Sequence, residues 1–155
     1  MKKRFALFMA ALGAALAACT PTRIPGPRTD TLGQPAIAPA AITLEGYKEA
    51  LAQRISNANA SLVYGGRPQA FLRSVVVVKF SIDASGKLLH SDIMRSNHDS
   101  TTEATALTSL RSSAPFPRPA VQLLKHGRLD ISETWLFNAD GRFQLRSIAQ
   151  PQMSE

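Results

Sequence analysis

The stretch Phe71-Leu-Arg-Ser-Val-Val-Val-Val-Lys-Phe-Ser-Ile-Asp83 decides the fold, because large apolar side chains recur at every second position of its later part. An extended chain points successive side chains to opposite faces of a sheet, so this period of two predicts a β-strand with one strongly buried face. Asp83-Ala-Ser-Gly86 then supplies a turn. Residues 87–96 predict a second strand, which pairs with the first as an antiparallel hairpin.

Two helices are predicted, one before and one after this hairpin. Apolar residues recur at intervals of three and four from residue 44 to residue 62, with Thr43 as N-cap and Gly65-Gly66 as C-cap. Ser100-Thr-Thr-Glu103 predicts a capping box at the start of the second helix, and Pro115-Phe-Pro-Arg-Pro119 ends that helix. Both helices present one apolar face to a core.

Residues 128–138 predict a third strand, in which Trp135 alternates with Ile131 and Phe137 and is expected in the core. Asn138-Ala-Asp-Gly141 can turn the chain into a short fourth strand through Phe143 and Leu145. The fold class is therefore α+β. We expect a small antiparallel sheet of three strands, plus the short fourth, with two helices on one face and the order α-β-β-α-β(-β).

The N-terminus has the layout of a bacterial lipoprotein signal. Met1-Lys2-Lys3-Arg4 precedes an uncharged run up to Ala18, and Leu16-Ala17-Ala18-Cys19 resembles the lipobox at which the leader is removed. We therefore expect residues 1–18 to be cleaved and Cys19 to carry the lipid that attaches the chain to a membrane. Residues 19–43 form a proline-rich tether, 44–148 one domain and 149–155 a tail. Thr20 after Cys19 favours the outer membrane.

The charge of the chain restricts its partners. The formal net charge is +7, and loss of the three basic residues of the leader leaves 15 basic and 11 acidic side chains. This mild excess, on an exported chain, makes nucleic acid an unexpected partner. The basic surface can instead contact anionic envelope polymers such as peptidoglycan.

The sequence offers little for catalysis. His90 and Asp92 are expected on one solvated face of a strand, opposite the inward residues Leu89, Ser91 and Ile93. His98-Asp99 precedes a helix, where such a pair usually caps or turns the chain. Neither the histidines nor the single cysteine has the spacing of a metal site, and no cofactor motif is present. A non-enzymatic protein is expected, and a hydrolase using His90, Asp92 or His98 is the least favoured alternative.

Residues 44–148 resemble the C-terminal domain of the TonB and TolA families of periplasmic energy transducers. The resemblance lies in the order of short motifs: an aromatic entry, an alternating strand, a turn glycine, a second strand ending in Ser, an aromatic-proline stretch and an aromatic last strand. The matching residues are Tyr64, Pro68-Gln69-Ala70, Val76, Val78, Phe80, Ile82, Gly86, Leu88, Ser96, Ala114-Pro-Phe-Pro-Arg-Pro119, Trp135 and Phe137.

The resemblance implies a module that binds another envelope protein by accepting an extended segment at a sheet edge. The implied edge is the strand Arg128-Leu129-Asp130-Ile131-Ser132-Glu133-Thr134-Trp135. A fourth strand through residues 143–147 would cover this edge. Energy transducers carry an uncleaved membrane helix where this chain has a lipid, so we expect no transduction of proton-motive force by this chain alone. An assembly or scaffolding part of an envelope complex, associated with peptidoglycan, is the alternative.

Overall fold

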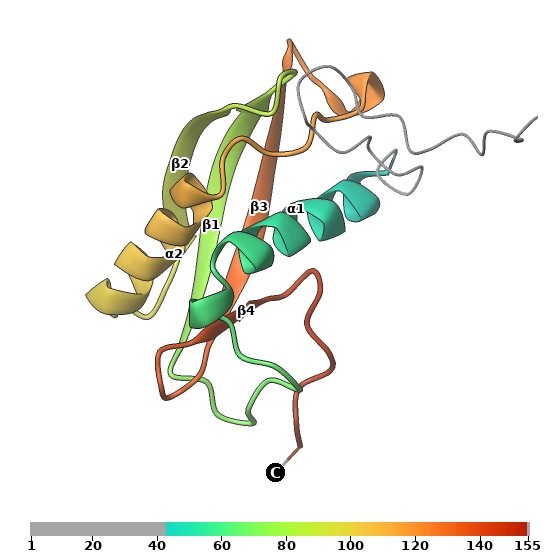
Figure 1. Ribbon diagram of the computed structural model, residues 1–155. Helices are drawn as coiled ribbons and strands as arrows, with labels where there is room; N and C mark the ends of the chain where they lie inside the picture. Colours follow the sequence, from blue (N-terminus) through green and yellow to red (C-terminus); the bar gives the residue numbers. More distant parts are fainter. Residues whose placement is uncertain (1–42, 155) are drawn as a thin grey trace, which may run out of the picture.

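The 71–83 stretch forms the strand on which the sheet is built. A computed structural model describes residues 43–154, and β1 (Ser74–Asp83) lies at the centre of its sheet. The other elements are α1 (Leu44–Ala58), η2 (Ala60–Leu62), β2 (Leu88–Arg95), α2 (Ser100–Ser112), η3 (Val121–Leu123), β3 (Arg128–Phe137) and β4 (Phe143–Leu145). This order confirms the predicted α+β class (Figure 1).

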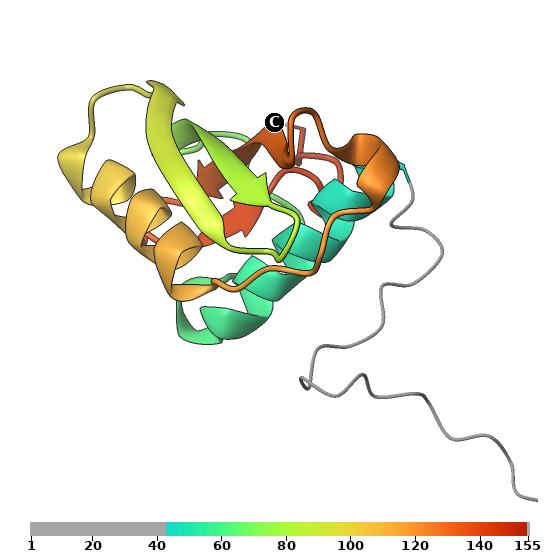
Figure 2. The same ribbon diagram turned by 90° about the horizontal axis from the view of Figure 1, so that it is seen from above.

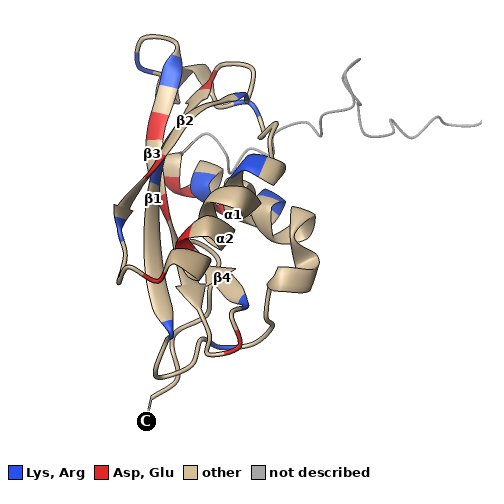
Figure 3. Cartoon of the chain, turned by 90° about the vertical axis from the view of Figure 1, so that its left-hand side faces the viewer, with Lys and Arg blue, Asp and Glu red and all other residues tan. Residues whose placement is uncertain are grey.

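The sheet is antiparallel and has the strand order β2-β1-β3-β4. β1 pairs with β3 along its whole length, from Ser74 opposite Phe137 to Asp83 opposite Arg128. Seen from above and from the side, both helices lie on one side of the sheet (Figures 2 and 3). The described part of the chain therefore has two layers, with the core between them.

The alternation of β1 determines which side chains enter this core. Those that face the helices, from Val76 to Ile82, are at most 1% exposed. They pack with Tyr47, Leu51, Ala52 and Ile55 of α1, Ala106 and Leu110 of α2, and Phe116, Leu129, Ile131, Trp135, Phe137, Phe143 and Leu145. Each large apolar side chain buried in this way contributes ~1.5–3 kcal/mol. Trp135 is buried as predicted, and its indole N–H donates to Ser109 Oγ at 3.0 Å.

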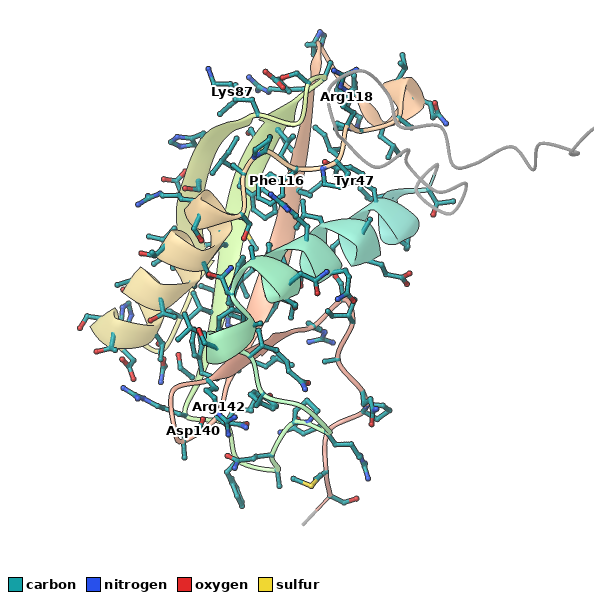
Figure 4. The ribbon with its side chains drawn as sticks, viewed as in Figure 1. Tyr47, Lys87, Phe116, Arg118, Asp140 and Arg142 are labelled. Carbon is teal, nitrogen blue, oxygen red and sulfur yellow. The ribbon has the colours of Figure 1, made fainter. Side chains whose placement is uncertain are left out.

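The segment after α2 closes the upper end of the core. The Tyr47 hydroxyl of α1 donates to the Pro117 carbonyl at 2.8 Å, and the neighbouring Phe116 ring is fully buried (Figure 4). Burial raises the pKa of Tyr47 above its ordinary value, so the phenol stays neutral. This contact ties the first helix to the proline-rich stretch at 115–119.

The first helix ends earlier than the sequence indicated. Thr43 is the N-cap as predicted, but α1 stops at Ala58 with Asn59 as C-cap, and a separate 3-10 turn follows. The prediction of Gly65-Gly66 as C-cap was therefore wrong. The Asn59 amide donates to Ile55 O, Ser109 O and Ser113 Oγ, and these bonds to both helices end α1 before the glycines are reached.

The N-cap of the second helix lies one residue before the one that the predicted capping box implied. Asp99 is the N-cap, and its carboxylate accepts from the Thr101 and Thr102 N–H groups. The box was wrong because Glu103 does not reach back to the N-cap backbone. Its carboxylate instead accepts from the hydroxyl of Ser96, the residue after β2.

The C-terminal segment is attached to the loop before β1. Arg67 donates to the Pro151 and Gln152 carbonyls, the Gln152 amide donates to Gln69 O and Ala70 O, and Met153 N–H donates to Pro68 O. Residues 149–155 were expected as a tail beyond the domain. Residues 151–153 are instead hydrogen-bonded to the loop at residues 67–70.

Candidate functional site

The eight residues predicted as a binding edge all lie on β3, and they alternate between its two faces. Leu129, Ile131, Glu133 and Trp135 face the helices and are at most 7% exposed. Arg128, Asp130, Ser132 and Thr134 face the other side and are at least partly exposed. A segment bound at this edge would pair with the backbone of β3, so the hydrogen bonds that each β3 residue already makes determine where binding is possible.

β3 is covered by β4 only at its end. Trp135 pairs with Leu145 and Phe137 with Phe143, and Arg146 N–H donates to Thr134 O at 2.9 Å. The chain then turns away, because Ile148 N–H bonds back to Leu145 O. Trp135 is therefore not an edge position, as expected if the fourth strand pairs there, whereas the preceding residues are free of β4.

At its other end, β3 is closed by a tight turn. Lys125 N–H donates to Arg128 O at 2.8 Å and Arg128 N–H to Lys125 O at 3.2 Å. The backbone groups of Arg128 and Thr134 thus point away from β1. Backbone groups of an antiparallel strand alternate in direction, so those of Asp130 and Ser132 point the same way.

Asp130 and Ser132 form a short open edge. Within residues 43–154 their outward-pointing backbone N–H and C=O groups have no backbone hydrogen-bond partner, because β4 pairs only with residues 135–137. We call these four backbone groups the open edge. Unpaired strand groups of this kind are a template for another chain.

The opposite edge of the sheet, β2, is less suited to pairing because it carries two bulges. Ser81 pairs with His90 but Ile82 with Leu88, which leaves Leu89 as an extra residue, and Met94 is extra in the same way. Leu89 is 49% and Met94 61% exposed, so the prediction of Leu89 as inward was wrong: the bulge turns it to solvent. Bulges twist an edge and disfavour further strands.

The face of the sheet away from the helices carries a charged hollow of about 370 Å³. Lys79, His90, Asp92, Arg128 and Asp130 line it. Asp130 accepts from Ser81 Oγ and from Arg128 Nε, and these bonds, with Lys79 nearby, hold its pKa below the ordinary value. His90 Nε2 lies against Asp92 Oδ2, with both side chains more than half exposed. Charges of both signs therefore line this hollow.

The two histidine-aspartate pairs are not brought together. His90 and Asp92 lie near the start of β2, and His98-Asp99 follows its other end. Asp99 caps α2 and accepts from Arg73 Nε at 2.8 Å, an ion pair that holds its pKa below the ordinary value. No group of three His, Cys, Asp or Glu residues within the described part could hold a metal ion.

Sequence reasoning passed over Glu133 as a distinct feature of this strand. Its inward direction follows from the alternation with Ile131 and Trp135, which was visible in the sequence. That one of its carboxylate oxygens, Oε2, has no hydrogen-bond partner among the described residues was not visible, because that depends on which elements surround the strand.

The predicted lipid attachment site, Cys19, and the tether lie outside the described residues. No described helix is both long and apolar enough to cross a membrane. Comparison with protein-family models, with curated proteins and with solved structures found no match for this chain.

Proposed function

We propose that this chain is a non-enzymatic lipoprotein, anchored through Cys19 in the outer membrane and facing the periplasm, whose domain binds another envelope protein by strand addition at the open edge. The open edge at Asp130 and Ser132 carries this proposal. It lies on the ten-residue strand β3, between a tight turn at Lys125–Arg128 and the Arg146 contact.

The open edge supports binding of modest strength. A hydrogen bond contributes about 0.5–1.5 kcal/mol net, so four backbone bonds provide about 2–6 kcal/mol in total. Association costs at least about 4 kcal/mol of translational and rotational freedom. Side-chain contacts must therefore supply the remaining affinity and the selection of the partner.

The resemblance of residues 44–148 to the TonB and TolA C-terminal domains, together with a small antiparallel sheet that has an unpaired edge, supports a binding module. The same resemblance does not extend to energy coupling, because the chain has a lipobox where a transducer has its membrane helix. The proposal is binding without transduction of proton-motive force.

Replacing Ser132 by Pro tests the edge directly. The Ser132 N–H points away from β1, so proline removes an edge donor without removing a bond inside the sheet. Ser132→Ala is the matched control, because it changes the same side chain and keeps the N–H. We expect crosslinking in intact cells, followed by recovery of the lipoprotein, to lose its partner band with Ser132→Pro and keep it with Ser132→Ala. Equal partner recovery from both variants would refute edge binding.

The anchor has its own test. Labelling of cells with radioactive palmitate should mark the wild-type protein and not Cys19→Ala, since the thiol is the acceptor of the lipid. Label that persists in Cys19→Ala would contradict lipid attachment at this residue.

A variant in which His90, Asp92 and His98 are all Ala should keep its cellular function, since no catalytic role is proposed for them.

The charged hollow favours a second candidate, a scaffold associated with peptidoglycan. Lys79 and Arg128 offer cations to the anionic polymer on the face of the sheet away from the two described helices. If this holds, the protein sediments with purified peptidoglycan at low salt and is released at high salt, because exposed charges are screened. Sedimentation that Lys79→Ala and Arg128→Ala leave unchanged would remove this candidate.

A further inference from the structure

Glu133 is the only charged residue among the buried residues in the described part of the chain, with 3% of its surface exposed. It lies on the inward face of β3 between Ile131 and Trp135, opposite Val78 of β1. A carboxylate in such surroundings needs hydrogen bonds or a cation to offset its lost hydration. The hydrogen-bond partners of the Glu133 carboxylate therefore determine whether this cost is offset.

Only half of this carboxylate is satisfied. Oε1 accepts the N–H of Thr134 at 2.7 Å, whereas Oε2 has no hydrogen-bond partner among the described residues. No Lys, Arg or His nitrogen in that part of the chain lies within 4.0 Å of it. The structure thus contains a buried carboxylate oxygen with nothing bound to it.

This carboxylate lies next to the open edge. Its Oε1 accepts the Thr134 N–H. The Thr134 carbonyl accepts the Arg146 N–H, which is the last backbone bond between β3 and the segment that contains β4. The next outward-pointing group towards the start of β3 is that of Ser132. A segment added there would place one side chain beside Glu133 on the inward face, since directly opposed residues have Cβ atoms about 4.5–5.5 Å apart.

We propose that the partner segment that occupies the open edge carries a Lys or Arg whose terminal nitrogen pairs with Glu133 Oε2. This inference rests on the proposed function. A cation satisfies the free oxygen with a charge-assisted hydrogen bond. Because Glu133 is almost fully buried, the side chain that reaches it must be long and apolar along its stem, as in Lys and Arg.

The same arrangement disfavours other partners. An apolar side chain at this position would leave Oε2 unpaired, and an acidic one would add repulsion in a poorly hydrated site. The overall charge alone would favour acidic peptides, because the chain without its leader has 15 basic and 11 acidic side chains. Selection of a basic residue would therefore come from a local feature.

A positional-scanning library of nine-residue peptides tests this pairing. The full lipidated chain, in detergent and immobilised, is exposed to the library. We expect Lys and Arg to be enriched about tenfold at one position among retained peptides, a difference of about 1.4 kcal/mol. Glu133→Gln should abolish that preference while peptide binding persists. Glu49→Gln, which removes an exposed charge of α1, should keep it.

Circular dichroism checks that Glu133→Gln is folded, and Glu133→Asp, a shortened carboxylate, serves as a second variant with reduced enrichment. Absence of a basic preference, with binding that is still lost in Ser132→Pro, would overturn the Glu133 pairing and leave edge binding intact. Binding unaffected by Ser132→Pro would overturn both. A basic preference that survives in Glu133→Gln would assign it to another charge and also overturn the inference.

Discussion

Gly86, in the turn between β1 and β2, occupies a position that a side chain cannot share. Its φ is +89°, and a Cβ placed on it would lie 2.0 Å from the Phe116 carbonyl oxygen. Phe116 N–H also donates to Gly86 O at 2.8 Å, so the two backbones approach each other directly. The turn glycine is therefore required for the proline-rich segment to close the core.

We expect Gly86→Ala to lower the free energy of unfolding by at least about 2 kcal/mol, through backbone strain and displacement of Phe116. Gly65→Ala is the matched control, because nothing lies within 4 Å of a Cβ there and its φ is not positive. That variant should stay within about 0.5 kcal/mol of wild type. Urea unfolding measures both, and equal stability of the two variants would contradict the close approach.

Asp99 couples the start of α2 to Arg73, and this coupling depends on pH. The Arg73 guanidinium and the Thr102 N–H hold the Asp99 pKa below its ordinary value. A depressed pKa gives stability that is present above the unfolded-state value of about 3.9 and is lost as pH falls through the folded value.

Asp99→Asn should therefore be less stable than wild type at pH 7, and the difference should shrink as the pH falls from about 3.9 towards 2, since the protonated acid resembles the amide. Thermal unfolding at several pH values measures this convergence. A stability difference that stays constant down to pH 2 would show that the charge of Asp99 contributes nothing.

At the scale of elements, Asn59 connects the two helices. Its amide bonds the last turn of α1 through Ile55 O and reaches Ser109 O and Ser113 Oγ near the end of α2. In Asn59→Ala the Ile55 carbonyl keeps the backbone N–H of residue 59 and the Ser109 carbonyl keeps the Ser112 and Ser113 hydroxyls, so only the bonds between the helices are lost. We expect Asn59→Ala to destabilise the domain by about 0.5–1.5 kcal/mol.

Asn57→Ala provides the comparison for this prediction, since Asn57 is exposed and, among the described residues, its side chain accepts only from Gln53 of the same helix. Chemical unfolding of the two variants should rank Asn59→Ala well below Asn57→Ala. If they are equally stable, the contact between the helices depends on apolar packing and not on this amide.

These elements also mark what the sequence could predict. The alternation in β1, the turn glycine and the helical spacing are local patterns, and they predicted the element order and the inward side chains from Val76 to Ile82. The end of α1 depends on the contacts of Asn59 with α2. The exposure of Leu89 depends on a bulge in the pairing of β1 with β2. Both arise from tertiary pairing, which has no local period.

The binding edge was predicted in the same partial way. The strand at 128–135 could be identified from its pattern, and the short fourth strand from Phe143 and Leu145. How far β4 reaches along β3 depends on the turn after Leu145, where Ile148 bonds back. The open edge and the half-satisfied Glu133 both follow from where that pairing stops.

At the scale of the whole molecule, the described residues share one core, and unfolding should be a single event. The buried residues of both helices and of β1, β3 and β4 belong to one cluster. Trp135, the only tryptophan, is fully buried in it and bonded to Ser109 of α2. Its fluorescence therefore reports the contact between sheet and helices.

In urea, the Trp135 fluorescence change and the loss of far-ultraviolet circular dichroism should have the same midpoint and the same slope. Small domains with one core unfold without populated intermediates, with slopes of about 1–3 kcal/mol per molar urea. Ser109→Ala removes the indole partner and should shift both midpoints together. If fluorescence changes at lower urea than circular dichroism, the helices separate from the sheet first, and the two layers do not form one cooperative unit.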